Sequence, residues 1–347
     1  MLNSHYYNSL TYQEQQAYDS MRSAIQNRQA SCSLGLNNLA SLEKTWKAVV
    51  FENPEFIHYH GLVMCGSTTQ AEFYYPEEIT EGKSGGINQA LFYEEYNRLV
   101  EKINASIPEA ADDYGVCKCI YDAVCTNIAY DHAVLRDYYK LDQNNQEEVR
   151  GFLIEHCESF TAYGALLNKK GVCQAVSKLF NMLCDSFGIQ CLCVEAQTND
   201  SNKTGHMLNV VEIDEKRYFV DVTTGLSSPE MPMVLYNYFM VDKQTISVPY
   251  IIFGEFECDH KDKSYFKNHK IAFRSLSELK RYLSSYVYSS TKGQIRCQYI
   301  GGGISDDDLR DIFEQVVGDK CSAGYRLCAS AVLHGFISGL IVNSRED

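Results

Sequence analysis

The stretch Gly171-Val172-Cys173-Gln174-Ala175 puts a cysteine at the start of a segment with helical periodicity. Apolar residues then recur at three- and four-residue spacing: Val176, Leu179, Phe180, Leu183, Cys184 and Phe187. Gly188, directly after them, can end the helix. In the first turn of a helix, unpaired backbone N–H groups and the positive end of the dipole favour a thiolate. The pattern therefore predicts that Cys173 is a nucleophile, although a free cysteine taken alone is more often an inert core residue.

Further along the chain, a polar turn separates two segments that alternate like β-strands. If Asp214 and Glu215 form a two-residue hairpin loop, Ile213 pairs with Lys216. This register decides which side chains share a face, because a slip of one residue moves every side chain of a strand to the other face.

The two strands carry a histidine and an aspartate, His206 and Asp221. In the register above, His206 lies opposite Thr223, and Asp221 lies two residues along on the same face. A diagonal pair of this kind has Cα atoms about 7–8 Å apart, within reach of an imidazole and a carboxylate. Cys173, His206 and Asp221 would then be a nucleophile, its base and the group that orients the base.

Four motifs follow one another in a fixed order: Gly171-Val172-Cys173, Gly188-Ile189, Gly205-His206 with Asn209, and Tyr218 through Thr223. This order resembles the transglutaminase-like superfamily of papain-like thiol enzymes. The family pattern is a Gly-Val-Cys helix start, a Gly-Ile helix end, a His strand with Asn three residues on, and a Val-Asp-x-Thr strand. The likeness covers roughly residues 110–275 and includes Asn127-Ile128-Ala129-Tyr130-Asp131 ahead of the cysteine.

Two departures from the family pattern lie close to the triad. Leu208 stands where the family often has a tryptophan two residues after the histidine, which leaves open what shields the His–Asp pair. Ala175 and Val176 stand where the family often has Gly-Tyr, which leaves the shape of the substrate groove open.

The resemblance implies acyl transfer through a thioester, with no cofactor. Cys173 would attack a carbonyl, His206 would activate the thiol and protonate the leaving amine, and Asp221 would hold the tautomer of His206. The backbone N–H of Cys173 is the natural first oxyanion donor. Gln174 and Asn209 are candidates for further contacts with the oxyanion or the substrate.

The acyl acceptor stays open. Water acting on a peptide bond gives a peptidase, water acting on a Gln amide gives a deamidase, and a Lys amine gives a crosslinking transglutaminase. We favour hydrolysis, because transfer to an amine needs a site that keeps water out, and the aromatic missing at Leu208 makes that harder. The competing class is a non-catalytic peptide-binding module on the same scaffold, since fold alone does not imply function. A third reading, a redox-sensing protein, rests only on the 14 cysteines.

The expected fold class is α+β, with the cysteine helix packed on an antiparallel sheet that bears the histidine and the aspartate. Residues 1–107 are expected to form a mainly helical N-terminal region, 108–288 the catalytic core, and 289–347 a small α+β C-terminal region. The N-terminal region either walls the substrate groove or is only a structural extension.

Composition limits the partners. The chain has 347 residues, of which 45% are hydrophobic and 22% charged, as in ordinary soluble globular proteins. A net charge of −14 without a basic patch argues against nucleic acid. We expect a protein or peptide substrate, and the oligomeric state stays open.

Cysteine spacing and apolar runs bear on location and metals. Fourteen cysteines with no apolar run after Met1 do not suggest a secreted disulfide framework. We therefore expect a cytoplasmic protein, with unconventional export left open. Residues 329–342 are apolar but too short for a membrane span. No CxxC pair has a matching second pair, so no metal site is predicted.

A glycine run near the C-terminus, Gly301-Gly302-Gly303, precedes Ser305 and a helical pattern. A glycine loop before a helix can hold a phosphate. Here Asp306, Asp307 and Asp308 would repel it, and Ser305 with Asp308 is better interpreted as a variant capping box.

Overall fold

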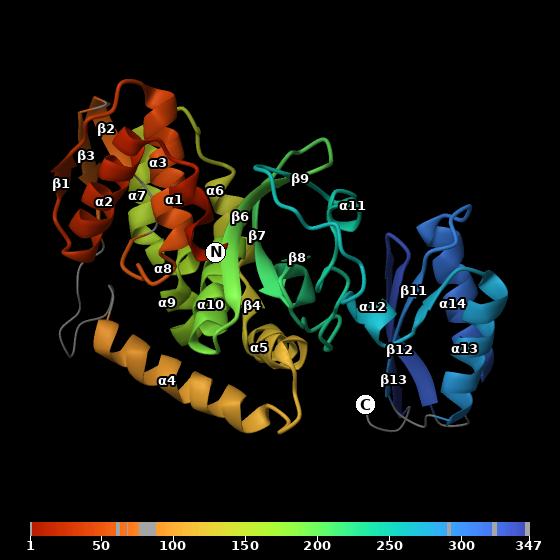
Figure 1. Cartoon of the computed structure of the whole chain (residues 1–347). Helices are drawn as coiled ribbons and strands as arrows, with labels where there is room; N and C mark the ends of the chain where they lie inside the picture. The colour runs from red at the N-terminus through yellow and green to blue at the C-terminus, as the bar shows by residue number, and fades with distance from the viewer. Residues whose placement is uncertain are drawn as a thin grey trace.

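The helix that begins at the cysteine, α10 (Cys173–Ser186), lies against an antiparallel sheet of strand order β8-β7-β6-β9 (Figure 1). The strands are β6 (Gln190–Thr198), β7 (Gly205–Ile213), β8 (Lys216–Val220) and β9 (Tyr250–Ile252). The computed structural model describes residues 2–59, 63–67, 69–75, 88–289, 293–320 and 325–343. The α+β prediction, with a cysteine helix on an antiparallel sheet, is confirmed.

Helix α10 forms as its apolar spacing predicts. Its residues Val176, Leu179 and Phe180 have no exposed surface, and burying a side chain of this size contributes roughly 1.5–3 kcal/mol. The helix starts after an extended Val172 and stops before Gly188, whose φ of +73° is a left-handed conformation that glycine adopts without strain.

The hairpin between β7 and β8 has the predicted loop. Ile213 pairs with Lys216, while Asp214 and Glu215 have φ values of 52° and 63°, as a type I′ turn requires. The ladder ends at the pair Asn209 and Val220, so the predicted pairing of His206 with Thr223 does not form. Instead Thr223 starts a 3₁₀ turn, η2 (Thr223–Gly225), because the carboxylate of Asp221 accepts the backbone N–H of Thr223 at 3.0 Å.

Further helices surround α10. They are α4 (Gln89–Ser106), α5 (Asp113–Asn127), α6 (His132–Tyr138), α7 (Gln146–Glu155), α8 (Cys157–Phe160) and α9 (Ala162–Leu167). Of these, α5, α8 and α9 contact α10, α4 packs on α9 and α5, and α6 and α7 lie beside the start of α10. A short parallel ladder joins β4 (Ala129–Tyr130) to β5 (Lys170–Gly171), directly before α10. This ladder ties the segment around Tyr130 to the start of the cysteine helix.

The N-terminal region packs on the same side of the sheet as the cysteine. It contains η1 (Leu2–Ser4), α1 (His5–Asn8), α2 (Tyr12–Gln26), α3 (Leu39–Glu52) and a sheet of β1 (Ser31–Ser33), β3 (Gln70–Phe73) and β2 (Val63–Ser67). Its apolar cluster includes Cys173, Cys193 and Met207 from the core. The N-terminal region therefore shares a packed interface with the start of α10.

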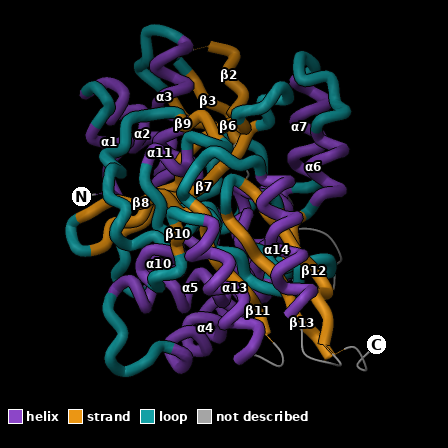
Figure 2. The backbone as a smooth tube through the Cα atoms, turned by 90° about the vertical axis from the view of Figure 1, so that its right-hand side faces the viewer, coloured by secondary structure: helices purple, strands orange, loops and turns teal. Residues whose placement is uncertain are grey.

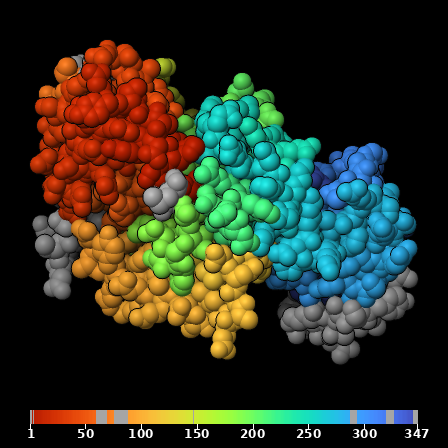
Figure 3. All heavy atoms as spheres, viewed as in Figure 1, coloured from red at the N-terminus to blue at the C-terminus, as the bar shows by residue number. Residues whose placement is uncertain are grey.

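The C-terminal region is a separate sheet covered by two helices on one face (Figures 1 and 2). Its elements are β10 (Ala272–Phe273), α13 (Leu276–Ser289), β11 (Gly293–Tyr299), α14 (Asp306–Lys320), β12 (Tyr325–Leu333) and β13 (Phe336–Asn343). The unit projects from the rest of the molecule in Figure 3. The predicted boundary at 288/289 falls inside it, because Leu279 and Leu283 of α13 are buried against Ile295 in the C-terminal cluster.

Two short helices, α11 (Lys243–Ile246) and α12 (Tyr265–Asn268), lie between the core sheet and the C-terminal unit (Figure 1). In the described part of the chain, no helix has the length and apolarity needed to cross a membrane. The same residues contain no group of three His, Cys, Asp or Glu side chains arranged to hold a metal ion.

Candidate active site

Three elements bring the predicted triad together. Cys173 begins α10, His206 is the second residue of β7, and Asp221 directly follows β8. Nε2 of His206 lies 3.1 Å from Oδ2 of Asp221, and the other side of the imidazole shares a hydrogen bond with the thiol of Cys173. The chain order and the contacts are those of a nucleophile, a base and an orienting carboxylate.

Asp221 is fully buried, and its carboxylate accepts four hydrogen bonds. Oδ1 accepts the backbone N–H groups of Thr223 and Thr224 at 3.0 and 3.3 Å. Oδ2 accepts from His206 and from the hydroxyl of Tyr250 at 2.8 Å. Burial alone would raise the pKa of Asp221, but the charge of His206 and these hydrogen bonds outweigh it and lower the pKa. The carboxylate is therefore held in its charged form.

The surroundings of Cys173 and His206 favour the charged form of both side chains. Burial works against charge in both groups, but the hydrogen bond and charge of His206 and the backbone N–H of Met207 lower the pKa of the Cys173 thiol. For His206, burial is outweighed by the charge and hydrogen bond of Asp221 and by Cys173, which raise its pKa to about 10. The arrangement thus favours a thiolate beside an imidazolium, which is the reactive form of a cysteine nucleophile.

The shield over the His–Asp pair comes from Tyr250, which sequence reasoning missed. Its ring stacks on the imidazole of His206, with centroids 4.5 Å apart and planes 7° apart. Tyr250 belongs to β9, which pairs with β6, and it is 7% exposed. The aromatic absent at Leu208 is thus supplied from another strand, 29 residues beyond Asp221, where no local motif marks it.

A second missed residue, Tyr130, lies against Cys173. Its hydroxyl forms hydrogen bonds with the backbone N–H and with the side chain of Cys173, and burial followed by the charge of Cys173 raises its pKa. The β4–β5 ladder pairs Tyr130 with Gly171, two residues before the cysteine, and so fixes this approach. The hydroxyl is placed beside the backbone N–H expected to bind an oxyanion.

The two other sequence candidates have different surroundings. Gln174 is half-buried and lines the cavity beside the triad. Asn209 has no exposed surface and donates to the backbone carbonyl of Ser177, one turn into α10, at 3.1 Å. Asn209 therefore anchors the cysteine helix to β7, and its role as an oxyanion or substrate contact stays a prediction.

A cavity of about 370 Å³ opens beside Cys173 and His206. Its lining is mainly aromatic and aliphatic, with Trp46, Val50 and Phe51 from α3, Leu135 and Tyr138 from α6, Tyr139 directly after it, and Leu153 from α7. Lys47 and Glu195 also line it and form an ion pair of 2.8 Å. The N-terminal region therefore walls this cavity, which answers the alternative left open by the sequence.

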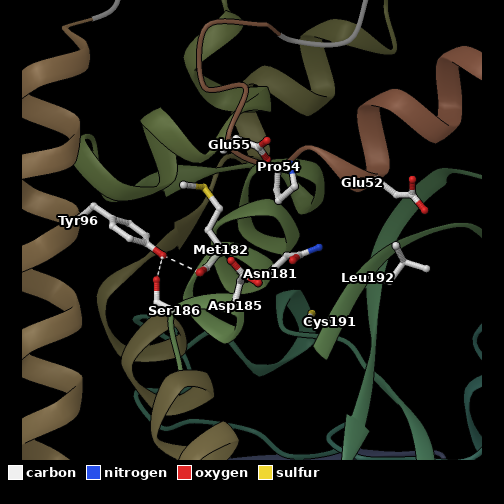
Figure 4. Close-up of a pocket in the computed structure, with 10 residues that line it drawn as sticks. All are labelled: Glu52, Pro54, Glu55, Tyr96, Asn181, Met182, Asp185, Ser186, Cys191 and Leu192. Carbon is white, nitrogen blue, oxygen red and sulfur yellow. Dashed lines mark hydrogen bonds between the residues drawn. The ribbon is translucent and has the colours of Figure 1, made fainter. Parts of the chain in front are cut away.

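A separate cavity of about 310 Å³ lies at the other end of α10 (Figure 4). The hydroxyl of Tyr96 there donates to the carbonyl of Met182 at 2.6 Å, and Glu52, Glu55 and Asp185 make the lining acidic. None of the triad residues lines this cavity. The candidate active site is therefore the cavity at the start of α10.

The α+β fold, with a cysteine at a helix start and a His–Asp pair on and directly after two adjacent strands, is consistent with a papain-like core. Residues 101–222 match the family model described as the transglutaminase-like superfamily. This segment is therefore a transglutaminase-like domain.

Parts of the chain are similar to solved structures at low sequence identity. A TGase structure is 15% identical over 40% of this chain and 33% of its own, with a TM-score of 0.30. A candidate cysteine protease from Cytophaga hutchinsonii is 14% identical over 49% of this chain and 53% of its own, with a TM-score of 0.27. A candidate protease from Parabacteroides distasonis is 8% identical over 81% and 60%, with a TM-score of 0.27. The chain spans less than two thirds of each, and no curated protein matches it.

Proposed function

We propose that this protein is a cysteine-dependent acyl-transfer enzyme that hydrolyses a peptide bond or a side-chain amide. The observation that carries the proposal is the buried Cys173–His206–Asp221 arrangement, with a lowered thiol pKa and a raised imidazole pKa. A pair polarised in this way supports nucleophilic chemistry, because the thiolate is the attacking species.

In the proposed reaction, the thiolate of Cys173 attacks the carbonyl carbon, and the C–N bond breaks as His206 gives its proton to the leaving amine. A thioester remains on the cysteine. His206 then takes a proton from water, whose oxygen attacks the thioester and regenerates the thiol. Asp221 stays ionised and keeps Nε2 of His206 oriented throughout.

The oxyanion would be stabilised by the backbone N–H of Cys173 and the hydroxyl of Tyr130. Both groups already lie together, since the hydroxyl is hydrogen-bonded to this N–H and to the thiol. On attack, the hydroxyl proton would turn from the sulfur to the developing oxyanion. Donors that already lie beside the reacting atom are effective because only the hydroxyl proton has to reorient when charge develops.

Hydrolysis is preferred to transfer onto an amine because water needs no second binding site, whereas a lysine side chain would have to enter the cavity beside the acyl chain. Tyr250 supplies the aromatic shield that Leu208 lacks, so the leucine gives no reason to prefer water as the acceptor. The mainly apolar walls favour an acyl donor with a large apolar side chain near the reacting amide.

The test is a substrate screen with three readouts and the Cys173→Ala variant as control. New N-termini report peptidase activity, released ammonia reports deamidation, and incorporation of a fluorescent amine into a glutamine-containing protein reports transglutamination. The proposal expects new N-termini or ammonia from the parent and none from Cys173→Ala. Amine incorporation exceeding hydrolysis would favour the transglutaminase instead. Peptide binding without turnover by either protein would favour the binding module.

A further inference from the structure

A cavity of about 500 Å³ lies away from the triad, where the catalytic core meets the C-terminal unit. Residues of α11, of the segment around α12, and of the ends of β11 and β13 line it. Figure 1 shows α11 and α12 between the two sheets. The proposed acyl-transfer chemistry makes no use of this cavity.

Three cations line the cavity: Lys261, Lys267 and Arg274. Lys261 is paired with Asp242 at 3.3 Å, and Asp242 is the one carboxylate among the lining residues. Lys267 and Arg274 form no ion pair with any residue that the structure describes. Partial burial lowers the pKa of Lys267, the charges of Lys261 and Arg274 lower it further, and Asp242 acts in the opposite direction. The cavity thus holds three cations and one carboxylate, in a chain whose net charge is −14.

Two further polar side chains, Ser264 and His334, lie in the same lining. The hydroxyl of Ser264 is buried and has no hydrogen-bond partner among the described residues. His334 also lines the cavity, and its Nδ1 shares a hydrogen bond of 2.5 Å with the hydroxyl of Tyr238.

The glycine run contributes backbone to this cavity, and the aspartates after it are already engaged. Gly302 lines the cavity and has open space where a side chain would stand. Asp306 accepts the backbone N–H groups of His334 and Gly335 at 2.6 and 2.9 Å. Asp308 accepts from Ser305, as the capping-box interpretation predicts, and Asp307 pairs with Arg310. The three aspartates, which were expected to repel a phosphate, are thus bonded to protein groups, and Lys261, Lys267 and Arg274 bring positive charge to the same cavity.

We infer that this cavity binds a small organic phosphate. Two cations without an ion-pair partner, Lys261 beside them and an exposed glycine backbone suit the several oxygens of a phosphate group better than a single carboxylate. Tyr299, Ile300 and Phe336 add an apolar wall, and the volume exceeds what a free phosphate ion fills. The ligand is therefore a phosphate ester with an apolar or ring-bearing part.

Binding is tested by titration calorimetry on the full chain at low ionic strength, where charge pairing is least screened. The probes are AMP and glucose 6-phosphate, with inorganic phosphate, adenosine and citrate for comparison. We expect a phosphate ester to bind saturably with a Kd below about 1 mM, at which binding is already worth several kcal/mol. Adenosine is expected not to bind. Saturable binding that weakens as salt is added would agree with a charged pocket.

Two substitutions locate the site. Arg274→Gln and Lys267→Gln are each expected to weaken binding about tenfold or more, as loss of a charge-assisted hydrogen bond does. Both side chains are exposed, so folding is not at risk. Lys280→Gln and Arg281→Gln, on exposed positions of α13 outside the cavity, are the matched controls and should bind like the parent. Failure of both esters to bind, tighter binding of citrate, or equal losses in the control variants would each overturn the inference.

Discussion

The ring of Tyr250 stacks on the imidazole of His206, with centroids 4.5 Å apart and planes 7° apart. The hydroxyl of the same tyrosine donates to Oδ2 of Asp221 at 2.8 Å. One side chain therefore covers the base and holds the group that orients it. A shield of this kind keeps water from competing for the His–Asp hydrogen bond, which is stronger in a dry environment.

Tyr250→Phe separates these two roles, because it keeps the ring and removes only the hydroxyl. Loss of a hydrogen bond to a charged group costs about 1.5–3 kcal/mol of folding free energy. We expect slower alkylation of Cys173 and a less acidic thiol pKa, since Asp221 is held less firmly. The measurement is the rate of alkylation against pH, with Tyr250→Leu as the variant that loses both roles. Parent-like profiles in Tyr250→Phe would show that the hydroxyl has no effect on the triad.

The pH dependence follows from the two shifted groups. The reactive thiolate–imidazolium pair exists above the pKa of Cys173, which is lowered, and below that of His206, which is raised to about 10. A raised histidine pKa stabilises the fold fully below the unfolded value of about 6.5. That contribution is lost as pH rises through about 10.

Asp221→Asn tests this origin of the shift. It removes the charge that raises the pKa of His206, so the alkaline limb of the activity profile should move down toward neutral pH. The profile of kcat/KM, or of alkylation where no substrate is in hand, reports the change. An alkaline limb that stays near pH 10 in Asp221→Asn would contradict the assigned cause.

Tyr130→Phe tests the proposed oxyanion donor. Removing one such donor lowers kcat by roughly 10²-fold in enzymes where it has been measured. We expect a loss of that order in kcat with little change in KM, because the interaction forms only as the oxyanion develops. Cys173 alkylation provides the control readout, since alkyl halides generate no oxyanion. Equal losses in turnover and alkylation would assign Tyr130 to thiol ionisation instead.

Asn209→Ala tests whether the motif asparagine is structural. Its amide bonds to Ser177 inside the fold, so its removal leaves a buried carbonyl without that donor and costs about 1–3 kcal/mol of unfolding free energy. We expect a lower thermal midpoint, with kcat/KM of the folded protein within a few-fold of the parent. Ser177→Ala removes the reciprocal bond from the Ser177 hydroxyl to Met207 and should behave alike. A large loss of kcat at unchanged stability would instead support Asn209 as a substrate contact.

Features of the fold that depend on residues close together in the sequence could be predicted. The start of α10, its apolar face and the Ile213–Lys216 register follow from periodicity and from turn length. Residues that reach the site through contacts between distant parts of the chain could not be predicted. Tyr250 depends on β9 pairing with β6, and Tyr130 depends on a two-residue ladder. Neither pairing has a sequence signal of its own.

The errors have the same physical origin. Thr223 leaves the ladder because the carboxylate of Asp221 captures its backbone N–H, a local competition that strand patterning does not contain. Helix α13 was assigned to the core because its apolar face does not say which sheet it covers, and Leu279 packs in the C-terminal cluster.

The central claim is that Cys173 and His206 form a reactive ion pair. The most direct measurement is the alkylation rate of Cys173 against pH, followed by peptide mass spectrometry in the parent and in His206→Ala. The account predicts fast, selective reaction near pH ~6, well below the ~8.5 of a free thiol, and a clear slowing in His206→Ala. Reaction of Cys173 no faster than that of other accessible cysteines, unchanged by His206→Ala, would contradict it and favour a binding module.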